Sequence, residues 1–204
     1  TSQVTGLTFH DMNMGQDHLT ILEESLVNIP FRSLSFQNAF DSSQFDFFYN
    51  EFLTGYITSH LIMLNLDKTV GIDIDKVISD LPIVTSLSFA YCNIDIAETL
   101  IKIGKANLPH LRLLNLSGNF GKKLFDLNDV KIPNELVRFD VNDVKWESGV
   151  LPSFIEYITS TKREKGLRLY LERATFITDG EISDKIINQS SKNSGDLDVT
   201  INIM

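Results

Sequence analysis

One pattern of apolar and polar positions recurs along this chain. It is clearest in "LPHLRLLNLSGN", residues 108–119, where Leu111, Leu114 and Leu116 are followed by Asn119. The intervals of three and two residues fit neither the stripe of a helix nor the alternation of a strand on its own. We therefore take L-x-x-L-x-L-x-x-N-x-φ, where φ is an apolar residue such as Ile94, Trp146 or Phe176, as a template for the rest of the sequence.

The template fits eight segments, and we call the chain from one match to the next a repeat unit. The first positions are residues 4, 31, 61, 84, 111, 136, 166 and 196, so neighbouring units begin between 23 residues (61 to 84) and 30 residues (31 to 61) apart. This near-constant spacing predicts stacked supersecondary units, each burying an apolar flank against its neighbours. The ninth position is filled, in chain order, by Met12, Ala39, Thr69, Cys92, Asn119, Val144 and Ala174, and the last unit stops after Val199 and Ile201.

The segments between the matches predict helices, because apolar residues recur in them at three- and four-residue intervals. Helices are expected over 17–29, 42–59, 97–107, 151–165 and 178–191, and only a turn or two over 73–81 and 122–131. Asp17, Ser43 and Asp95 are the expected N-terminal caps, and Pro152 suits a first helical turn. The fold class is therefore α/β, and the short strands without a G-x-G-x-x-G crossover disfavour a doubly wound sheet.

The motifs "LRLLNLSGN" and "VTSLSFAYCNI" resemble the leucine-rich repeat, and the spacing with a helix in each unit resembles its ribonuclease-inhibitor-like subclass. The resemblance covers essentially the whole chain. It implies a leucine-rich-repeat solenoid, or horseshoe, of about eight units, with a concave parallel sheet and outer helices. It also implies that the ninth side chain bonds to the backbone of the turn. The irregular repeats, the Phe substitutions and "LNLSGN" are most similar to the repeat domain of CARMIL-type regulators of actin capping protein.

The composition restricts the class of protein, the partners it can bind and its location in the cell. Apolar residues make up 43% and charged residues 22% of 204 residues, which is typical of a soluble globular protein. A net charge of −9 disfavours nucleic acid and anionic lipid, and no apolar run is long enough for membrane insertion. A single cysteine excludes an internal disulfide and favours a cytoplasmic location. We expect one domain over 1–204, as a fragment of a longer chain.

No constellation of residues points to catalysis, a cofactor or a metal ion. Cys92 lacks the neighbours of a thiol nucleophile and stands where the repeat needs a buried turn residue. Asp73 and Asp75 fit turn and cap positions better than a calcium loop, and a cation at Asp140 and Asn142 needs a third ligand from another unit. The histidines lack the spacing of metal ligands: His10, His18, His60 and His110. We therefore expect a protein that is not an enzyme.

The outward face of the strands is the better candidate site. Strand alternation predicts the side chains on that face: Thr8, His10, Ser35, Gln37, Asn65, Asp67, Ser88, Ala90, Asn115, Ser117, Asp140, Asn142, Arg168, Tyr170 and Glu172. Aromatic and charged residues gather at its C-terminal end, and Tyr and Arg are common interface hot spots. The candidate partner-binding residues are Arg138, Asp140, Asn142, Arg168, Tyr170, Glu172 and Arg173. The alternative is an ordinary solvated sheet, with Trp146 as core or interface filler.

These observations predict a non-catalytic scaffold or adaptor that binds a protein partner, and the resemblance implies a cytoskeletal role. One alternative is a structural component packed permanently in a large assembly. Another is the substrate-recognition part of a larger enzyme or effector. The pattern leaves open whether the concave or the convex face binds.

Overall fold

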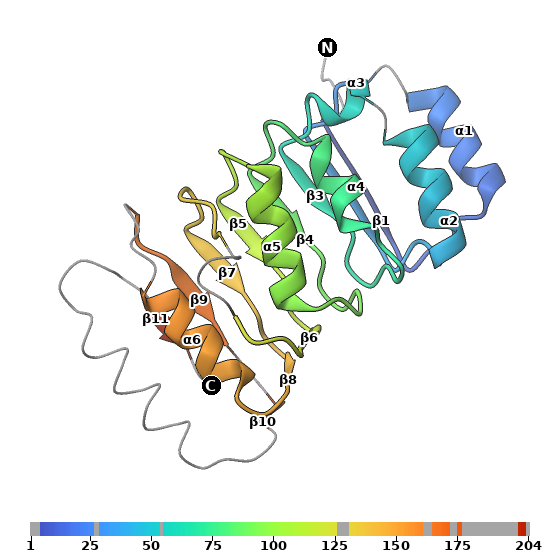
Figure 1. Ribbon diagram of the computed structural model, residues 1–204. Coiled ribbons are helices and arrows are strands. Elements are labelled where there is room, and N and C mark those ends of the chain that lie inside the picture. The colour runs from blue at the N-terminus through green and yellow to red at the C-terminus, as the bar shows by residue number, and fades with distance from the viewer. Residues whose placement is uncertain are drawn as a thin grey trace.

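The computed structural model describes residues 5–26, 29–53, 55–125, 131–160, 165–171, 175–176 and 200–202. In this part of the chain the main feature is a parallel sheet (Figure 1). Its strands follow one another in chain order: β1 (Gly6–His10), β2 (Ser33–Gln37), β3 (Met63–Asn65), β4 (Ser86–Ser88), β5 (Leu113–Asn115), β7 (Arg138–Asp140), β9 (Arg168–Tyr170) and β11 (Thr200–Asn202). The predicted α/β class and the parallel sheet are confirmed.

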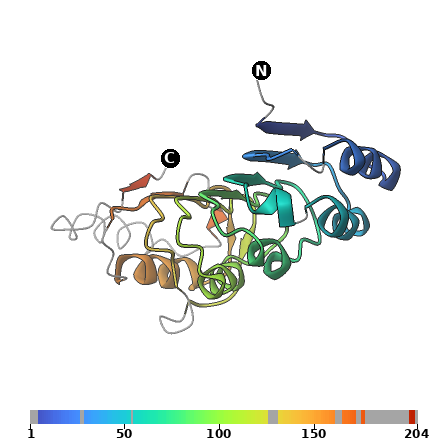
Figure 2. The ribbon, with the colours of Figure 1, turned by 90° about the horizontal axis from the view of Figure 1, so that it is seen from above.

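The helices lie on one side of this sheet (Figures 1 and 2). They are α1 (Gln16–Leu26), α2 (Ser42–Phe47), the π-helix η1 (Phe48–Phe52), α3 (Gly55–Thr58), α4 (Ile74–Ser79), α5 (Ile96–Ala106) and α6 (Val150–Ser160). The other face of the sheet carries no helix in the described part of the chain. None of these helices combines the length and the apolar character needed to cross a membrane.

A second, smaller parallel sheet follows the turns that end the main strands. It consists of β10 (Thr175–Phe176), β8 (Lys145–Trp146) and β6 (Phe120–Gly121), in that order. The eleventh template position, where an apolar residue is expected, falls on Gly121, Trp146 and Phe176, the second residue of each of these strands, although the template did not predict strands there. Gly121 is needed there because a Cβ at this position would lie 2.3 Å from Cε3 of Trp146, which is itself buried.

The strand register aligns the second leucine of the template across the sheet. Leu34 pairs with Leu64, Leu64 with Leu87, Leu87 with Leu114, and Leu114 with Phe139. The same row continues through Leu169. The spacing read from the sequence therefore places these residues correctly.

The last strand is out of step with the prediction. Ile201 pairs with Leu169, whereas the template placed Val199 at that position. A shift of two residues keeps the same side chains on the same face of a strand, so apolar alternation cannot separate the two registers. Other expectations for Val4, Ala174, Val199 and the helix over 178–191 fall on residues outside the described part.

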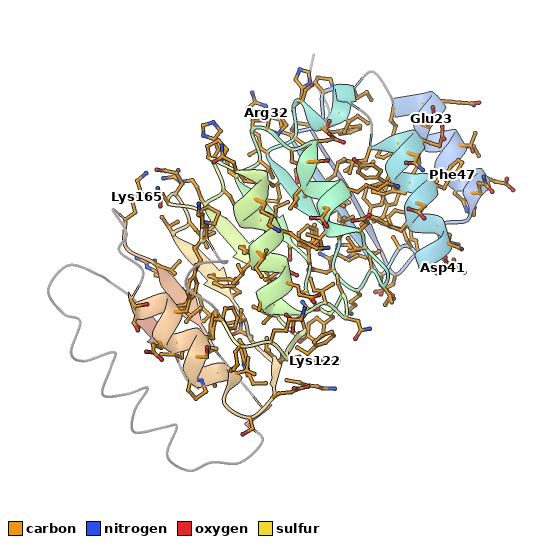
Figure 3. The ribbon with its side chains drawn as sticks, in the orientation of Figure 1. Glu23, Arg32, Asp41, Phe47, Lys122 and Lys165 are labelled. Carbon is orange, nitrogen blue, oxygen red and sulfur yellow. The ribbon has the colours of Figure 1, made fainter. Side chains whose placement is uncertain are left out.

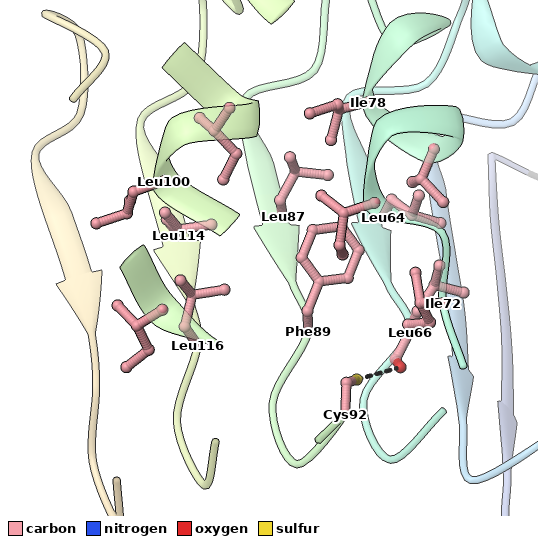
Figure 4. Packing of buried hydrophobic residues seen from close by; sticks show 14 of the residues in the cluster. Leu64, Leu66, Ile72, Ile78, Leu87, Phe89, Cys92, Leu100, Leu114 and Leu116 are labelled. Atoms are coloured by element: carbon pink, nitrogen blue, oxygen red, sulfur yellow. Dashed lines mark hydrogen bonds between the residues drawn. The ribbon is translucent and has the colours of Figure 1, made fainter. Parts of the chain in front are cut away.

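The inward residues form one continuous hydrophobic core between sheet and helices (Figure 4). Leu111, Leu114 and Leu116 are all buried, as predicted. In the unit that begins at Gly166, the glycine has no side chain to bury, and Leu167 fills the core one residue later.

The first unit departs from the template at its ninth position. Met12 was expected to be the buried turn residue, but it is 46% exposed and Met14 is buried instead. The backbone N–H of Met14 donates to the carbonyl of Ala39 at 3.1 Å, which aligns Met14 with the ninth position of the next unit. The turn of the first unit is therefore two residues longer than predicted.

Two helix starts also differ from the sequence prediction. Asp41, rather than Ser43, caps α2, because its carboxylate accepts the backbone N–H groups of Ser43 and Gln44 and the Gln44 side chain bonds back to the cap. Helix α1 begins at Gln16, which puts Asp17 in its first turn. Asp95 caps α5 as predicted, accepting the N–H of Glu98 at 3.0 Å.

The helix predicted over 42–59 is divided into α2, η1 and α3. Phe48 and Phe52, the first and last residues of the π-helix η1, are both buried and their rings stack at 5.5 Å. Phe48 also lies 4.7 Å from the ring of Phe36 on the sheet. Both phenylalanines of η1 therefore pack against Phe36 of the sheet.

Truncation of adjacent leucines tests which face of the sheet is buried. Leu114→Ala should lower the free energy of unfolding by about 2–5 kcal/mol, because it leaves a cavity between Leu87 and Phe139. Leu113→Ala is the matched control, and it should cost less than about 1 kcal/mol because Leu113 faces outward. Urea-induced unfolding measures both, and equal losses would contradict the assignment of the two faces.

Candidate functional site

The site is positioned by a row of turns at the ends of the strands, which we call the turn row. The eighth template position has a left-handed backbone in six consecutive units: Asp11, Asn38, Lys68, Tyr91, Gly118 and Asp143, with φ between 50 and 70°. In the first five of these residues, the backbone N–H donates to a backbone carbonyl in the next unit. The N–H of Lys68 donates to the carbonyl of Ala90, and that of Gly118 to the carbonyl of Asn142, both at 2.7 Å. The inter-strand ladder therefore continues into the turns, and it fixes which side chains point outward.

Asn119 ties two successive turns together, as the repeat pattern implied. Its Oδ1 accepts the backbone N–H groups of Cys92 and Ile94 at 3.0 and 3.2 Å. Its Nδ2 donates to the carbonyls of Phe89 at 2.8 Å and Leu116 at 2.9 Å. Because the side chain is buried, each of these backbone groups depends on the amide for its partner.

Cys92 occupies the same place one unit earlier and is buried, as predicted. Its thiol donates to the carbonyl of Leu66 at 3.2 Å (Figure 4). It also lies 3.4 Å from the carbonyl of Ala90, a second acceptor. Burial raises the pKa of this thiol to about 12. The thiolate needed for nucleophilic attack is therefore scarce at neutral pH, and the side chain serves the turn.

The middle of the outward face is a network of side chains that bond to one another. A carboxylate oxygen of Asp67 accepts from Ser88 Oγ at 2.6 Å and from Ala90 N at 2.7 Å. The other carboxylate oxygen accepts from Asn65 Nδ2 at 3.1 Å, and Asn115 Nδ2 donates to Ser88 Oγ at 3.0 Å. Much of the hydrogen-bonding capacity of this region is used within the protein.

The C-terminal end of the face is different, because its charges gather around an aromatic ring. Arg138 Nε donates to both carboxylate oxygens of Asp140, at 3.1 and 2.9 Å, and its Cζ lies 4.6 Å from the centroid of the Tyr170 ring. Arg168 pairs with Arg138 in the strand register. Arg138, Arg168, Tyr170, Leu113, Val137 and Gly166 line an open groove of about 450 Å³, which we call the β5–β9 groove.

The predicted site residues are only partly brought together. Arg138, Asp140, Arg168 and Tyr170 cluster around the β5–β9 groove. Asn142 belongs instead to the turn row, since its N–H donates to Ser117 Oγ at 3.1 Å and its carbonyl accepts from Gly118. Glu172 and Arg173 lie outside the described residues.

Sequence reasoning missed two apolar residues on the same face. Leu113 and Met63 occupy the third template position and are 39% and 43% exposed. The signal was available, because strand alternation places the third position outward together with the fifth and seventh. Trp146, in contrast, is buried as a core residue and stacks on Phe154 at 5.1 Å.

The acidic residues considered for cation binding have structural partners. Asp73 caps α4 by accepting the N–H of Lys76, and Asp75 pairs with Lys102 at 2.9 Å. Asp140 is paired with Arg138. Across the described residues, no group of three His, Cys, Asp or Glu side chains could hold a metal ion.

Comparison with known proteins adds no assignment. No protein-family model matches the chain, and a search of curated proteins finds no match.

Removing the buried amide tests the turn row. Asn119→Ala should lower the free energy of unfolding by about 2–4 kcal/mol, because it leaves several buried backbone groups without partners. Asn115→Ala is the control, since it deletes the same amide from a half-exposed position, and it should cost less than half as much. Thermal and urea unfolding would measure both variants. A neutral Asn119→Ala would mean that the turns hold together without this side chain.

The Cys92 thiol predicts a specific dependence of stability on pH. Its pKa is raised from 9.0 to about 12, so on alkalinisation the unfolded chain loses the proton first and folding stability falls between these two values. At about pH 10.5 the expected loss is about 2 kcal/mol, from 1.36 kcal/mol per pH unit. Cys92→Ser keeps a hydroxyl donor but does not titrate in this range, so it should lack this loss.

Urea unfolding of both proteins at about pH 8 and about pH 10.5 measures the difference. Tyr49, whose pKa burial and its bond to Asp80 raise to about 12, titrates in both proteins and cancels in the comparison. Identical pH dependence of the two proteins would show that the thiol is not shielded.

Proposed function

We propose that this chain is a leucine-rich-repeat solenoid of the ribonuclease-inhibitor-like subclass, a horseshoe of about eight units that acts as a non-catalytic protein-binding scaffold. The partner binds on the outward face of the sheet, and the β5–β9 groove is the centre of the contact. The observation that carries the proposal is the contrast along that face. Its middle is bonded internally, whereas Arg138, Arg168 and Tyr170 present charge and aromatic surface at one end.

The recurrence of local geometry supports the repeat assignment. Equivalent leucines pair strand by strand, and the eighth template position has a left-handed backbone in the first six units. Asn119 and Cys92 both bond to the backbone of the turn, which is the role that the leucine-rich repeat gives to that position.

The residue types at the groove support protein binding. Arg and Tyr dominate interface hot spots, and an exposed Leu113 beside them supplies apolar area. Arg138 is already held by Asp140 and Tyr170, so it loses less side-chain freedom when a partner arrives. By resemblance to CARMIL-type regulators, we place the scaffold in the cytoplasm, in a cytoskeletal role.

A double variant tests the site. Arg168→Ala with Tyr170→Ala should weaken binding of a protein partner at least tenfold while changing the melting temperature little, because the removed atoms lie on the outward face. The partner is first identified by affinity capture from native extract and mass spectrometry, and its affinity is then measured by calorimetry. Ser33→Ala with Ser86→Ala, on the same face at β2 and β4, is the matched control. Unaltered affinity in the double variant would exclude this site.

An apolar patch favours a second candidate function, a structural component of a permanent assembly. Met12 and Ile21 are exposed, and with Phe9, Met14 and Leu22 they border a hollow of about 300 Å³ at β1 and α1. Water contact with such a patch is unfavourable, and a permanent neighbour would cover it. Analytical ultracentrifugation separates the two functions. A monodisperse monomer at all concentrations supports the scaffold, whereas self-association that Ile21→Glu abolishes supports the assembly component.

A further inference from the structure

We propose that the β5–β9 groove binds an acidic segment of a protein partner, with a partner carboxylate between Arg138 and Arg168 and a partner apolar side chain against Leu113. This inference rests on the proposed scaffold function and adds the chemistry that the groove recognises. It concerns the side chains at the third template position of β5, β7 and β9, which lie side by side in the register.

The two arginines form an unbalanced pair. Arg138 and Arg168 are direct partners across β7 and β9, at a strand separation of about 4.8 Å. Like charges opposite each other on parallel or antiparallel neighbours repel, which is unfavourable for the sheet. Asp140 compensates Arg138 at 2.9 Å, but Arg168 is exposed and has no ion-pair partner among the described residues. An added carboxylate between the guanidinium groups would relieve this repulsion.

Further basic side chains lie near the groove, around the carboxylate of Glu135. Lys165 bonds to Glu135 at the same edge of the sheet, and it is the main reason that the pKa of Glu135 is lowered, with smaller contributions from Arg112 and His110. The same row of outward positions is uncharged at the other end of the sheet, where it consists of Gly6, Ser33, Met63 and Ser86. In this row the positive charges are therefore confined to Arg138 on β7 and Arg168 on β9.

The groove combines this charge with apolar walls. Leu113 is 39% exposed, and Val137 and the ring of Tyr170 complete the lining. Arg138 covers one face of that ring, which holds its guanidinium in place for a bidentate bond. A binding segment that matches these walls carries an acidic residue with an apolar residue close by.

The overall charge argues for a peptide rather than a nucleic acid. The chain carries a net charge of −9, so a long polyanion is repelled from most of its surface. Tight nucleic-acid binding needs several phosphate contacts, whereas this groove offers one pair of arginines. A short acidic segment needs only that pair.

Fluorescence anisotropy with synthetic peptides tests the proposal. The probe is a fluorescein-labelled peptide that alternates Glu and Leu, and its matched partner has every Glu replaced by Gln. We expect the Glu peptide to bind about tenfold more tightly than the Gln peptide, and its affinity to fall as salt rises. Equal binding of the two peptides would overturn the proposal.

Charge variants of the protein locate the binding. Arg168→Ala should weaken the Glu peptide about tenfold, Arg168→Glu should abolish its binding, and Arg168→Lys should fall between wild type and alanine, because lysine keeps the charge without the planar fork. Arg32→Ala is the control, since it removes an exposed arginine from the same edge at β2 (Figure 3), and it should leave affinity unchanged. An equal loss in Arg32→Ala would assign the binding to general charge.

Further outcomes distinguish an error in the ligand chemistry from an error in the binding site. Binding of a single-stranded RNA with the same dependence on Arg168 would overturn the assignment to an acidic peptide. If the Glu peptide fails to bind while the double variant at Arg168 and Tyr170 still loses its captured partner, the scaffold stands and the acidic chemistry is wrong. If the captured partner binds that double variant normally, the proposed site itself is wrong.

Discussion

Backbone hydrogen bonds between equivalent positions of neighbouring repeat units determine both faces of this molecule. At the start of β2, β3, β4, β5 and β7, the N–H groups of two successive residues donate to one carbonyl of the preceding unit, as Thr85 and Ser86 do to Ile62, at 2.8 and 3.1 Å. Beyond the strand, the left-handed turn residue makes the next link. With the register fixed at both ends, side-chain alternation leaves no choice about which residues are buried.

The sequence predicted the position of a side chain correctly where only one arrangement satisfies the pattern. The leucines of the template are apolar at fixed intervals, so their burial and pairing could be predicted, and so could the role of Asp95 and Cys92. The errors lie where several arrangements satisfy the same pattern. Ile201 and Val199 are interchangeable under a two-residue shift, and Met12 and Met14 are both apolar, so only backbone bonding decides between them.

The candidate site was predictable in part for the same reason. Alternation brought Arg138, Asp140, Arg168 and Tyr170 to one face, and the structure places them around one groove. The pattern could not predict which polar side chains bond to one another within the protein and which are left for a partner. Asn65, Asp67 and Ser88 look as available in the sequence as Arg168 does, but they are bonded to one another. The network depends on a contact between residues 21 positions apart, Ser88 and Asp67, which no local pattern reveals.

The spacing of the repeat units has a consequence for how such a surface changes over evolution. The chain between paired leucines ranges from 23 residues (Leu64 to Leu87) to 30 residues (Leu34 to Leu64), yet the strands keep the same register. Differences in length are absorbed on the helical side, which holds the three short elements α2, η1 and α3 in one unit and the single helix α5 in another. Neighbouring strands of the sheet therefore keep a constant separation of about 4.8 Å, whatever the length of the chain between them. Insertions on the helical side can therefore change the size and stability of the protein without moving the outward side chains of the strands.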